Sequence, residues 1–222
     1  MVSPAALRVG ASCAIVGGSV TLALDVLHPS DPAPDDIVRQ LELIAATPTW
    51  AALHWGLGLG LLLILGAFVV LELTLRGSDG EIWARGGLAA MVVATAVWVI
   101  AFALEAALAD LAADARVDPA IVPTAGAVID VAESVVSGGI LVNWLGTALF
   151  GLALWRSRRY PVWLGLPALA LSLVILAAVG VPRAFVGTSR LVDNVLFPTL
   201  AALSLAWTVA LGVVLWRRAS RG

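Results

Sequence analysis

The chain contains six runs of about 20 apolar residues, each long enough to cross the hydrocarbon core of a bilayer as a helix. Backbone N–H and C=O groups find no partners in lipid, so each run must pair its own backbone groups in an α-helix. The runs cover residues 9–27, 51–73, 86–108, 135–155, 162–181 and 195–216. The sequence therefore predicts an all-α, polytopic membrane protein with six transmembrane helices that form a single domain over residues 1–222.

The composition agrees with this class and excludes several others. Hydrophobic residues make up 61% of the chain and charged residues 13%, whereas about a quarter of a soluble domain is charged. A net charge of −2 provides no positive field for nucleic acid, which leaves the lipid bilayer as the first expected partner. The single cysteine, Cys13, excludes an intramolecular disulfide. No nucleophile motif, phosphate-binding loop or nucleotide fingerprint indicates a hydrolase, a kinase or an ATPase.

The arginines predict the orientation of the helices. Nine of the thirteen flank one set of helix ends, and four flank the opposite set. The first set comprises Arg8, Arg76, Arg85, Arg156, Arg158, Arg159, Arg217, Arg218 and Arg221, and the second comprises Arg39, Arg116, Arg183 and Arg190. Because basic residues accumulate on the cytoplasmic side, both termini are predicted to be cytoplasmic (N-in, C-in) in a bacterial inner membrane.

The outer connections are predicted to carry additional helix. After Pro34 the first outer loop places Ile37, Leu41 and Ile44 on one helical face, which is typical of an amphipathic helix lying along the outer surface. The third and fourth transmembrane helices keep a helical composition beyond the bilayer, up to a break near residues 118–123. We therefore expect an outer interfacial helix and outward extensions of helices three and four.

Two segments resemble a known group of proteins. The segment "LFGLALWRSRRYPVWLGLPALALSL" is a helix that ends in Arg-Ser-Arg and turns through Pro-x-Trp into the next helix, and "VWVIAFALEAAL" places Glu105 near the end of helix three. Both are similar to patterns in uncharacterised six-pass bacterial membrane proteins that are grouped as a domain of unknown function. The resemblance implies the six-helix topology and carries no activity.

Residue counts place several polar side chains in one outer layer. A helix rises about 1.5 Å per residue, so His28, His54 and Glu105 lie roughly 30 to 33 Å above the level of the cytoplasmic arginines. Glu133 and Asp193 lie roughly 35 Å above that level. This layer predicts an outward-facing polar pocket that binds, senses or transports a small ligand. The candidate ligand-binding residues are Asp25, His28, His54, Glu105, Glu133, Asn143 and Arg183. Asn143 lies deeper and has interhelical hydrogen bonding as an alternative role.

The two histidines suggest a more specific hypothesis. Gly56 and Gly60 have the small-xxx-small spacing that lets helices approach closely, which would bring His54 toward His28. With Asp25 or Glu105, the pair could bind a metal ion or serve as axial ligands of a b-type haem in a redox protein or membrane enzyme. A shared ligand requires imidazoles within about 4 to 5 Å, and a separation above about 8 Å would exclude it.

Two simpler interpretations remain open. In the first, the histidines lie at the interface between the bilayer and water without binding a ligand, and Asp25 pairs with Arg183 or with its neighbour His28. In the second, the protein is a structural accessory subunit of a membrane complex or a homo-oligomer, and the polar layer is a docking surface. The sequence does not decide whether the chain is an enzyme or which cofactor, if any, it carries.

Overall fold

The computed structural model describes residues 2–29, 36–187, 189 and 191–221. All regular structure in this part of the chain is helical, with no strand, and six helices are long and apolar enough to cross a membrane. They run over Pro4–Leu27, Trp50–Leu75, Glu81–Ala115, Pro119–Ser157, Val162–Phe185 and Val192–Ala219. The protein is a multi-pass membrane protein whose surface contacts the lipid bilayer.

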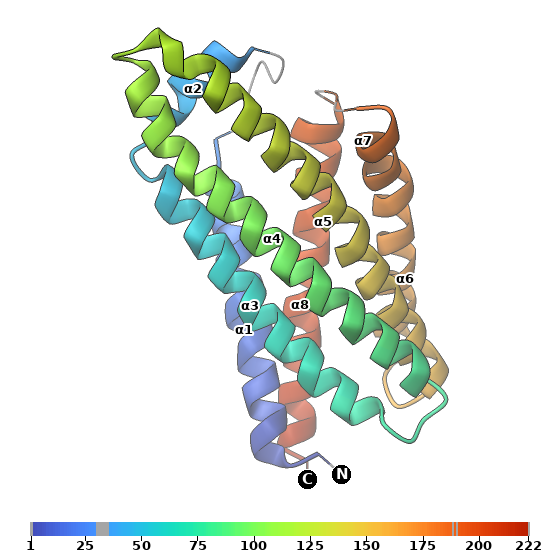
Figure 1. Ribbon diagram of the computed structural model, residues 1–222. Coiled ribbons are helices and arrows are strands. Elements are labelled where there is room, and N and C mark those ends of the chain that lie inside the picture. Colours follow the sequence, from blue (N-terminus) through green and yellow to red (C-terminus); the bar gives the residue numbers. More distant parts are fainter. Residues whose placement is uncertain (1, 30–35, 188, 190, 222) are drawn as a thin grey trace.

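The six spans form one antiparallel bundle (Figure 1). Four spans are the helices α1 (Pro4–Leu27), α3 (Trp50–Leu75), α4 (Glu81–Ala115) and α5 (Val122–Ser157). The fifth is α6 (Val162–Ile175), the π-helical turn η2 (Leu176–Gly180) and α7 (Val181–Phe185), and the sixth is the π-helical turn η3 (Val192–Leu196) and α8 (Phe197–Ala219). Helix α1 packs on α3 and α8, and α4 packs on α3 and α5.

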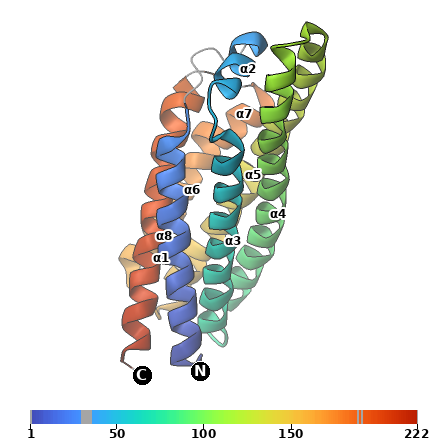
Figure 2. The same cartoon turned by 90° about the vertical axis from the view of Figure 1, so that its left-hand side faces the viewer.

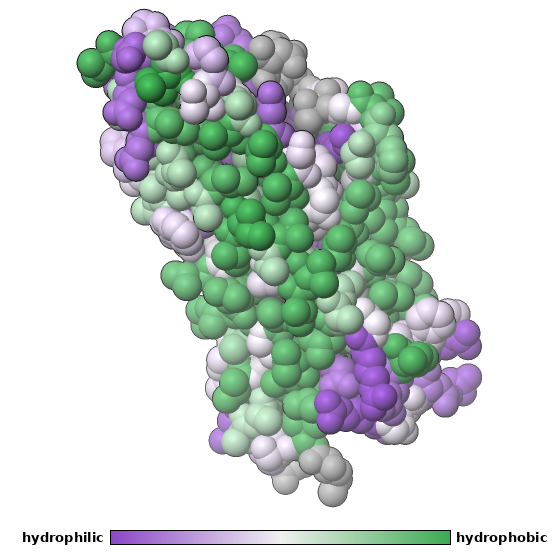
Figure 3. Space-filling view, viewed as in Figure 1, coloured by the Kyte–Doolittle hydropathy of each residue, from purple (hydrophilic) through white to green (hydrophobic). Residues whose placement is uncertain are grey.

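The two ends of the bundle differ in their connections (Figures 1 and 2). Both termini and the α3–α4 and α5–α6 connections lie at one end, here called the terminal end. The opposite end, here called the α2 end, carries the short helix α2 (Ile37–Ala45) beside the α4–α5 connection with its 3-10 turn η1 (Pro119–Ile121). Hydrophobic residues cover most of the side of the bundle, and hydrophilic residues gather toward its two ends (Figure 3).

Helix α2 packs its apolar face onto α4 and α5. The carboxylate of Asp36 caps the helix by accepting the backbone N–H of Arg39 at 3.1 Å. Leu41 and Ile44 are buried in a cluster with Leu108 and Ile129. The predicted amphipathic segment is therefore a helix in the structure, while Pro34, at which its prediction started, and the outer arginine Arg190 lie outside the described residues.

Small residues allow α1 and α3 to approach closely. A Cβ added at Gly17 would lie 2.8 Å from the carbonyl oxygen of Gly60, and one added at Gly60 would lie 2.2 Å from Oγ1 of Thr21. Neither site has room for a side chain. The small-residue spacing in α3 thus corresponds to a real helix contact, and this contact brings the ends of α1 and α3 together at His28 and His54.

The terminal end is held by the loop between α5 and α6. The guanidinium group of Arg159 donates hydrogen bonds to the carbonyl oxygens of Thr74, Arg76 and Gly77 at 2.8 to 3.0 Å. Thr74 lies in the last turn of α3, where carbonyl groups have no partner within the helix, and Arg76 and Gly77 directly follow the helix. Tyr160 is buried, and its hydroxyl lies 2.7 Å from that of Thr74. The Arg-Ser-Arg-Arg-Tyr-Pro segment therefore has a structural role, since it caps α3 from a distant loop.

Candidate ligand-binding site

An arginine is buried among carboxylates at the α2 end. The side chain of Arg183, on α7, is 5% exposed and forms ion pairs with Glu133 of α5 and Asp193 of η3. A buried guanidinium group is costly unless it is paired, so the three side chains hold α7, α5 and the start of the last span together. The Nε–H of Arg183 is also buried and has no hydrogen-bond partner among the described residues.

Two π-helical turns place Arg183 in this position. The turn η2 comes directly before α7, which begins at Val181 and Pro182, and the turn η3 contains Asp193. Pro182 has no backbone N–H, so it cannot continue the α-helical hydrogen bonds of the preceding span. A π-helical turn adds a residue to the helical repeat and rotates the helical face that follows it, and such turns are frequent at functional sites. Arg183 lies on the face of α7 that follows the turn η2, and its side chain reaches Glu133 of α5.

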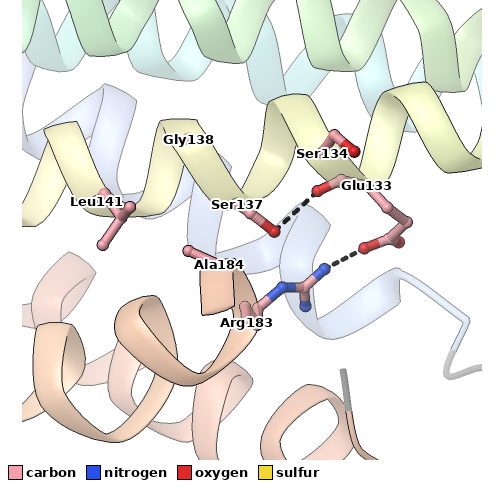
Figure 4. A pocket seen from close by; sticks show the side chains of 7 residues that line it. All are labelled: Glu133, Ser134, Ser137, Gly138, Leu141, Arg183 and Ala184. Carbon is pink, nitrogen blue, oxygen red and sulfur yellow. Dashed lines mark hydrogen bonds and ion pairs between the residues drawn. The ribbon is translucent and has the colours of Figure 1, made fainter. Parts of the chain in front are cut away.

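A cavity lies beside this ion cluster, between α5 and α7 (Figure 4). Its volume is about 310 Å³, at the lower end of the roughly 300 to 1,000 Å³ of small-molecule pockets. The lining residues are Glu133, Ser134, Ser137, Gly138, Leu141, Arg183 and Ala184. The hydroxyl of Ser137 donates to the backbone carbonyl of Glu133 at 2.9 Å. A Cβ added at Gly138 would meet nothing within 4 Å, so open space adjoins α5 at this residue.

The cavity is polar at one end and apolar at the other. Glu133 and Ser134 lie near one end of the cavity, where Arg183 reaches Glu133, and Leu141 lies two helical turns further along α5 (Figure 4). Eight residues of α-helix between Glu133 and Leu141 correspond to about 12 Å. A ligand that fills the cavity would therefore need a polar group at one end and an apolar part at the other.

The charges around Arg183 do not balance. Glu105 of α4 interacts electrostatically with both Glu133 and Arg183. The carboxyl groups of Glu133 and Asp193 form ion pairs with the guanidinium group of Arg183, so two carboxylates face one cation in a partly buried place. Charges separated from water interact more strongly than charges at a surface, and an excess of one sign there is unfavourable. The paired groups therefore carry an excess of one negative charge.

The two histidines also meet at the α2 end. Nε2 of His28, which follows α1, lies 3.3 Å from Nε2 of His54 on α3, and the ring centroids are 5.1 Å apart. The other ring nitrogens face backbone carbonyls: Nδ1 of His28 lies 3.0 Å from the oxygen of Pro29, and Nδ1 of His54 lies 2.8 Å from the oxygen of Trp50. His54 is buried, and burial lowers the pKa of His28, although the Pro29 carbonyl opposes this shift.

Trp50 connects the histidines to the ion cluster. Its ring centroid lies 5.1 Å from that of His28 and 4.7 Å from that of His54. Its indole N–H donates to the backbone carbonyl of Glu105 at 2.7 Å. The carboxyl group of the same Glu105 interacts with Glu133 and Arg183, so the two groups of polar residues share a wall formed by α4.

Five of the predicted site residues form two groups in the structure, and the other two, Asn143 and Asp25, belong to neither group. Glu133 and Arg183 are paired, with Glu105 beside them, and His28 and His54 form the second group. Asn143 does not line the cavity. Its backbone carbonyl accepts a hydrogen bond from the hydroxyl of Thr147 at 3.0 Å. Asp25 contacts His28 through its backbone carbonyl, and the ion pairs of Arg183 go to Glu133 and Asp193 in place of the suggested Asp25.

Several residues of the site were not predicted. Asp193 was placed in the outer layer by residue counting but not in the site, because a count along one helix does not reveal the neighbouring helix. Ser137 follows Glu133 by four residues, and Trp50 precedes His54 by four. That i,i+4 spacing places the two residues of each pair on one helical face. It is the sequence pattern from which Ser137 and Trp50 could have been predicted as part of the site.

The described residues contain no group of three or more His, Cys, Asp or Glu side chains placed to hold a metal ion. Comparisons with protein-family models, with curated proteins and with solved structures found no match for this chain.

Proposed function

We propose that the protein binds a small amphiphile with a cationic head group in the cavity between α5 and α7. The observation that carries this proposal is the buried guanidinium group of Arg183, which lines a cavity of about 310 Å³ and is paired with two carboxylates, those of Glu133 and Asp193. An ammonium head group would neutralise the excess negative charge, and a short apolar chain would lie along Gly138 and Leu141. A ligand oxygen or a water molecule would accept a hydrogen bond from the Nε–H of Arg183.

In this proposal the cavity opens toward the outer side of a bacterial inner membrane. The nine cytoplasmic arginines of the topology prediction belong to the terminal end of the bundle, and α2 and the extensions of α4 and α5 then lie outside. Binding or sensing of the ligand is favoured over transport. The hydroxyls of Thr95, Thr147 and Thr208 bond to carbonyls of their own helices, and the core nearer the terminal end is apolar. Along the described parts of the six spans, these features provide no continuous polar path.

A comparison of three water-soluble probes tests the ligand class. Hexylammonium, hexanol and hexanoate share a six-carbon chain and differ in charge, and an alkylamine is protonated near neutral pH as lysine is. Thermal unfolding of the purified protein in a non-ionic detergent is followed with each probe. We expect hexylammonium to raise Tm and hexanoate to leave it unchanged. Stabilisation by hexanoate alone would contradict the cationic class, and no effect of any probe would contradict the cavity as a ligand site.

The substitution Gly138→Leu provides the matched control for that experiment. Its side chain enters open space in the cavity and replaces a helical glycine, so the variant should fold. We expect it to lose the stabilisation by hexylammonium. An equal response in the variant and in the wild type would show that the probe binds elsewhere.

The proposed orientation predicts which loops are exposed to the outside. In a Cys13→Ala background, Val117→Cys labels the α4–α5 connection, where Val117 is 87% exposed, and Ser220→Cys labels the residue after α8. A membrane-impermeant maleimide should modify the first variant in intact cells and the second only after the membrane is opened. Labelling of both in intact cells would overturn the orientation, and with it the outward opening of the cavity.

A further inference from the structure

The tautomers of His28 and His54 follow from their surroundings. A carbonyl oxygen can only accept a hydrogen bond, so the Nδ1 atoms that face the carbonyls of Pro29 and Trp50 must each carry the ring proton. A neutral imidazole has one N–H. Both Nε2 atoms are therefore unprotonated, and the two atoms, each with a lone pair, lie 3.3 Å apart.

Two lone pairs at this distance repel each other, so a positively charged species belongs between them. The distance between the two Nε2 atoms indicates which positively charged species it is. Nitrogens bound at 2.0 to 2.1 Å to a tetrahedral metal ion lie about 3.3 to 3.4 Å apart, which agrees with the 3.3 Å between the Nε2 atoms. Two nitrogens on opposite sides of an ion or of a haem iron would lie about 4 Å apart.

The second contacts of the rings also match those of metal ligands. A histidine that binds a metal almost always donates its other ring N–H to a carbonyl or a carboxylate, which fixes the orientation of the ring. Both histidines have this arrangement, and Trp50 packs against both rings. The pair is thus positioned by its neighbours before any ion binds.

We infer that His28 and His54 bind one divalent transition metal ion of the zinc class through their Nε2 atoms. Imidazole nitrogen suits Zn²⁺, Co²⁺, Ni²⁺ and Cu²⁺ and does not suit Mg²⁺ or Ca²⁺. The described residues provide no third side chain, so solvent or an exogenous ligand completes the coordination, and the site has the open positions of a binding or catalytic centre. The inference does not depend on the cavity between α5 and α7.

A titration with metal ions tests this site. Protein without an affinity tag is treated with a chelator, and ZnCl₂ or MgCl₂ is added in an isothermal titration calorimeter. We expect the wild type to bind one Zn²⁺ per chain and no Mg²⁺. Co²⁺ should produce the visible absorption bands of a tetrahedral complex. No Zn²⁺ binding would overturn the inference and would leave a shared proton as the species between the rings.

Variants show whether the histidines are the ligands. His28→Ala removes a half-buried side chain at the end of α1, so this variant should fold, and we expect Zn²⁺ affinity to fall at least tenfold. His54→Ala should behave in the same way. The control is Glu133→Gln, which changes a carboxylate of the ion cluster and should leave Zn²⁺ affinity unchanged. An unchanged affinity in both histidine variants would place the ion elsewhere and overturn the inference.

Discussion

Replacement of Arg183 by methionine is expected to lower the free energy of unfolding by about 3 to 5 kcal/mol, the usual cost of removing one partner of a buried ion pair. The substitution keeps much of the side-chain volume and leaves Asp193, which is 17% exposed, without its cation. Glu133 contributes less, because it is 46% exposed and water screens its charge. Unfolding of the purified protein in detergent measures the loss.

The double variant Arg183→Met/Asp193→Asn separates charge from packing. Because it removes the uncompensated carboxylate as well as the guanidinium group, we expect it to be more stable than Arg183→Met alone. If the single variant were as stable as the wild type, the ion cluster would not hold α7 and η3 against α5. The cavity would then lack the rigid wall that the proposed function requires.

The substitution Gly151→Leu is expected to leave no correctly folded protein. A Cβ added at Gly151 would lie 2.5 Å from the backbone nitrogen of Leu169 and 2.9 Å from the carbonyl oxygen of Gly165. Both atoms belong to the backbone of α6, so no side chain can move aside and the two helices must separate. Such a loss of packing exceeds the roughly 4 to 5 kcal/mol that marks exceptional substitutions.

The matched control is Gly138→Leu, the same substitution in the same helix. A Cβ at Gly138 meets no atom within 4 Å, so this variant should be recovered at the wild-type level. Size-exclusion chromatography after extraction measures the monodisperse fraction of each variant. Equal recovery of Gly151→Leu and the wild type would contradict the close contact between α5 and α6.

The six spans were predictable because length and apolarity decide whether a helix crosses a bilayer. The predicted runs lie within the six helices of the structure, which continue past them at one or both ends. Those polar and charged extensions are helical as well, and Glu105 and Glu133 lie near them. Counting 1.5 Å per residue also placed the polar residues at one end, because it depends only on helix geometry.

The neighbours of each residue were harder to predict. The proximity of His28 and His54 was expected from two adjacent antiparallel helices and from the glycine spacing in α3. Arg183 follows one π-helical turn and Asp193 lies in the other, and periodicity in the sequence does not reveal such a local change of helical repeat. The role of Arg159 depends on where the end of α3 lies in space, which no local pattern indicates.

The ligand of the cavity can be identified most directly by mass spectrometry. The wild type and Gly138→Leu are purified in parallel from the same cells, and the small molecules retained by each are extracted and compared. The proposed function predicts an amine-containing amphiphile that is enriched in the wild type and lost when leucine fills the cavity beside Arg183. Identical extracts from the two proteins, or a retained molecule that is anionic, would contradict it.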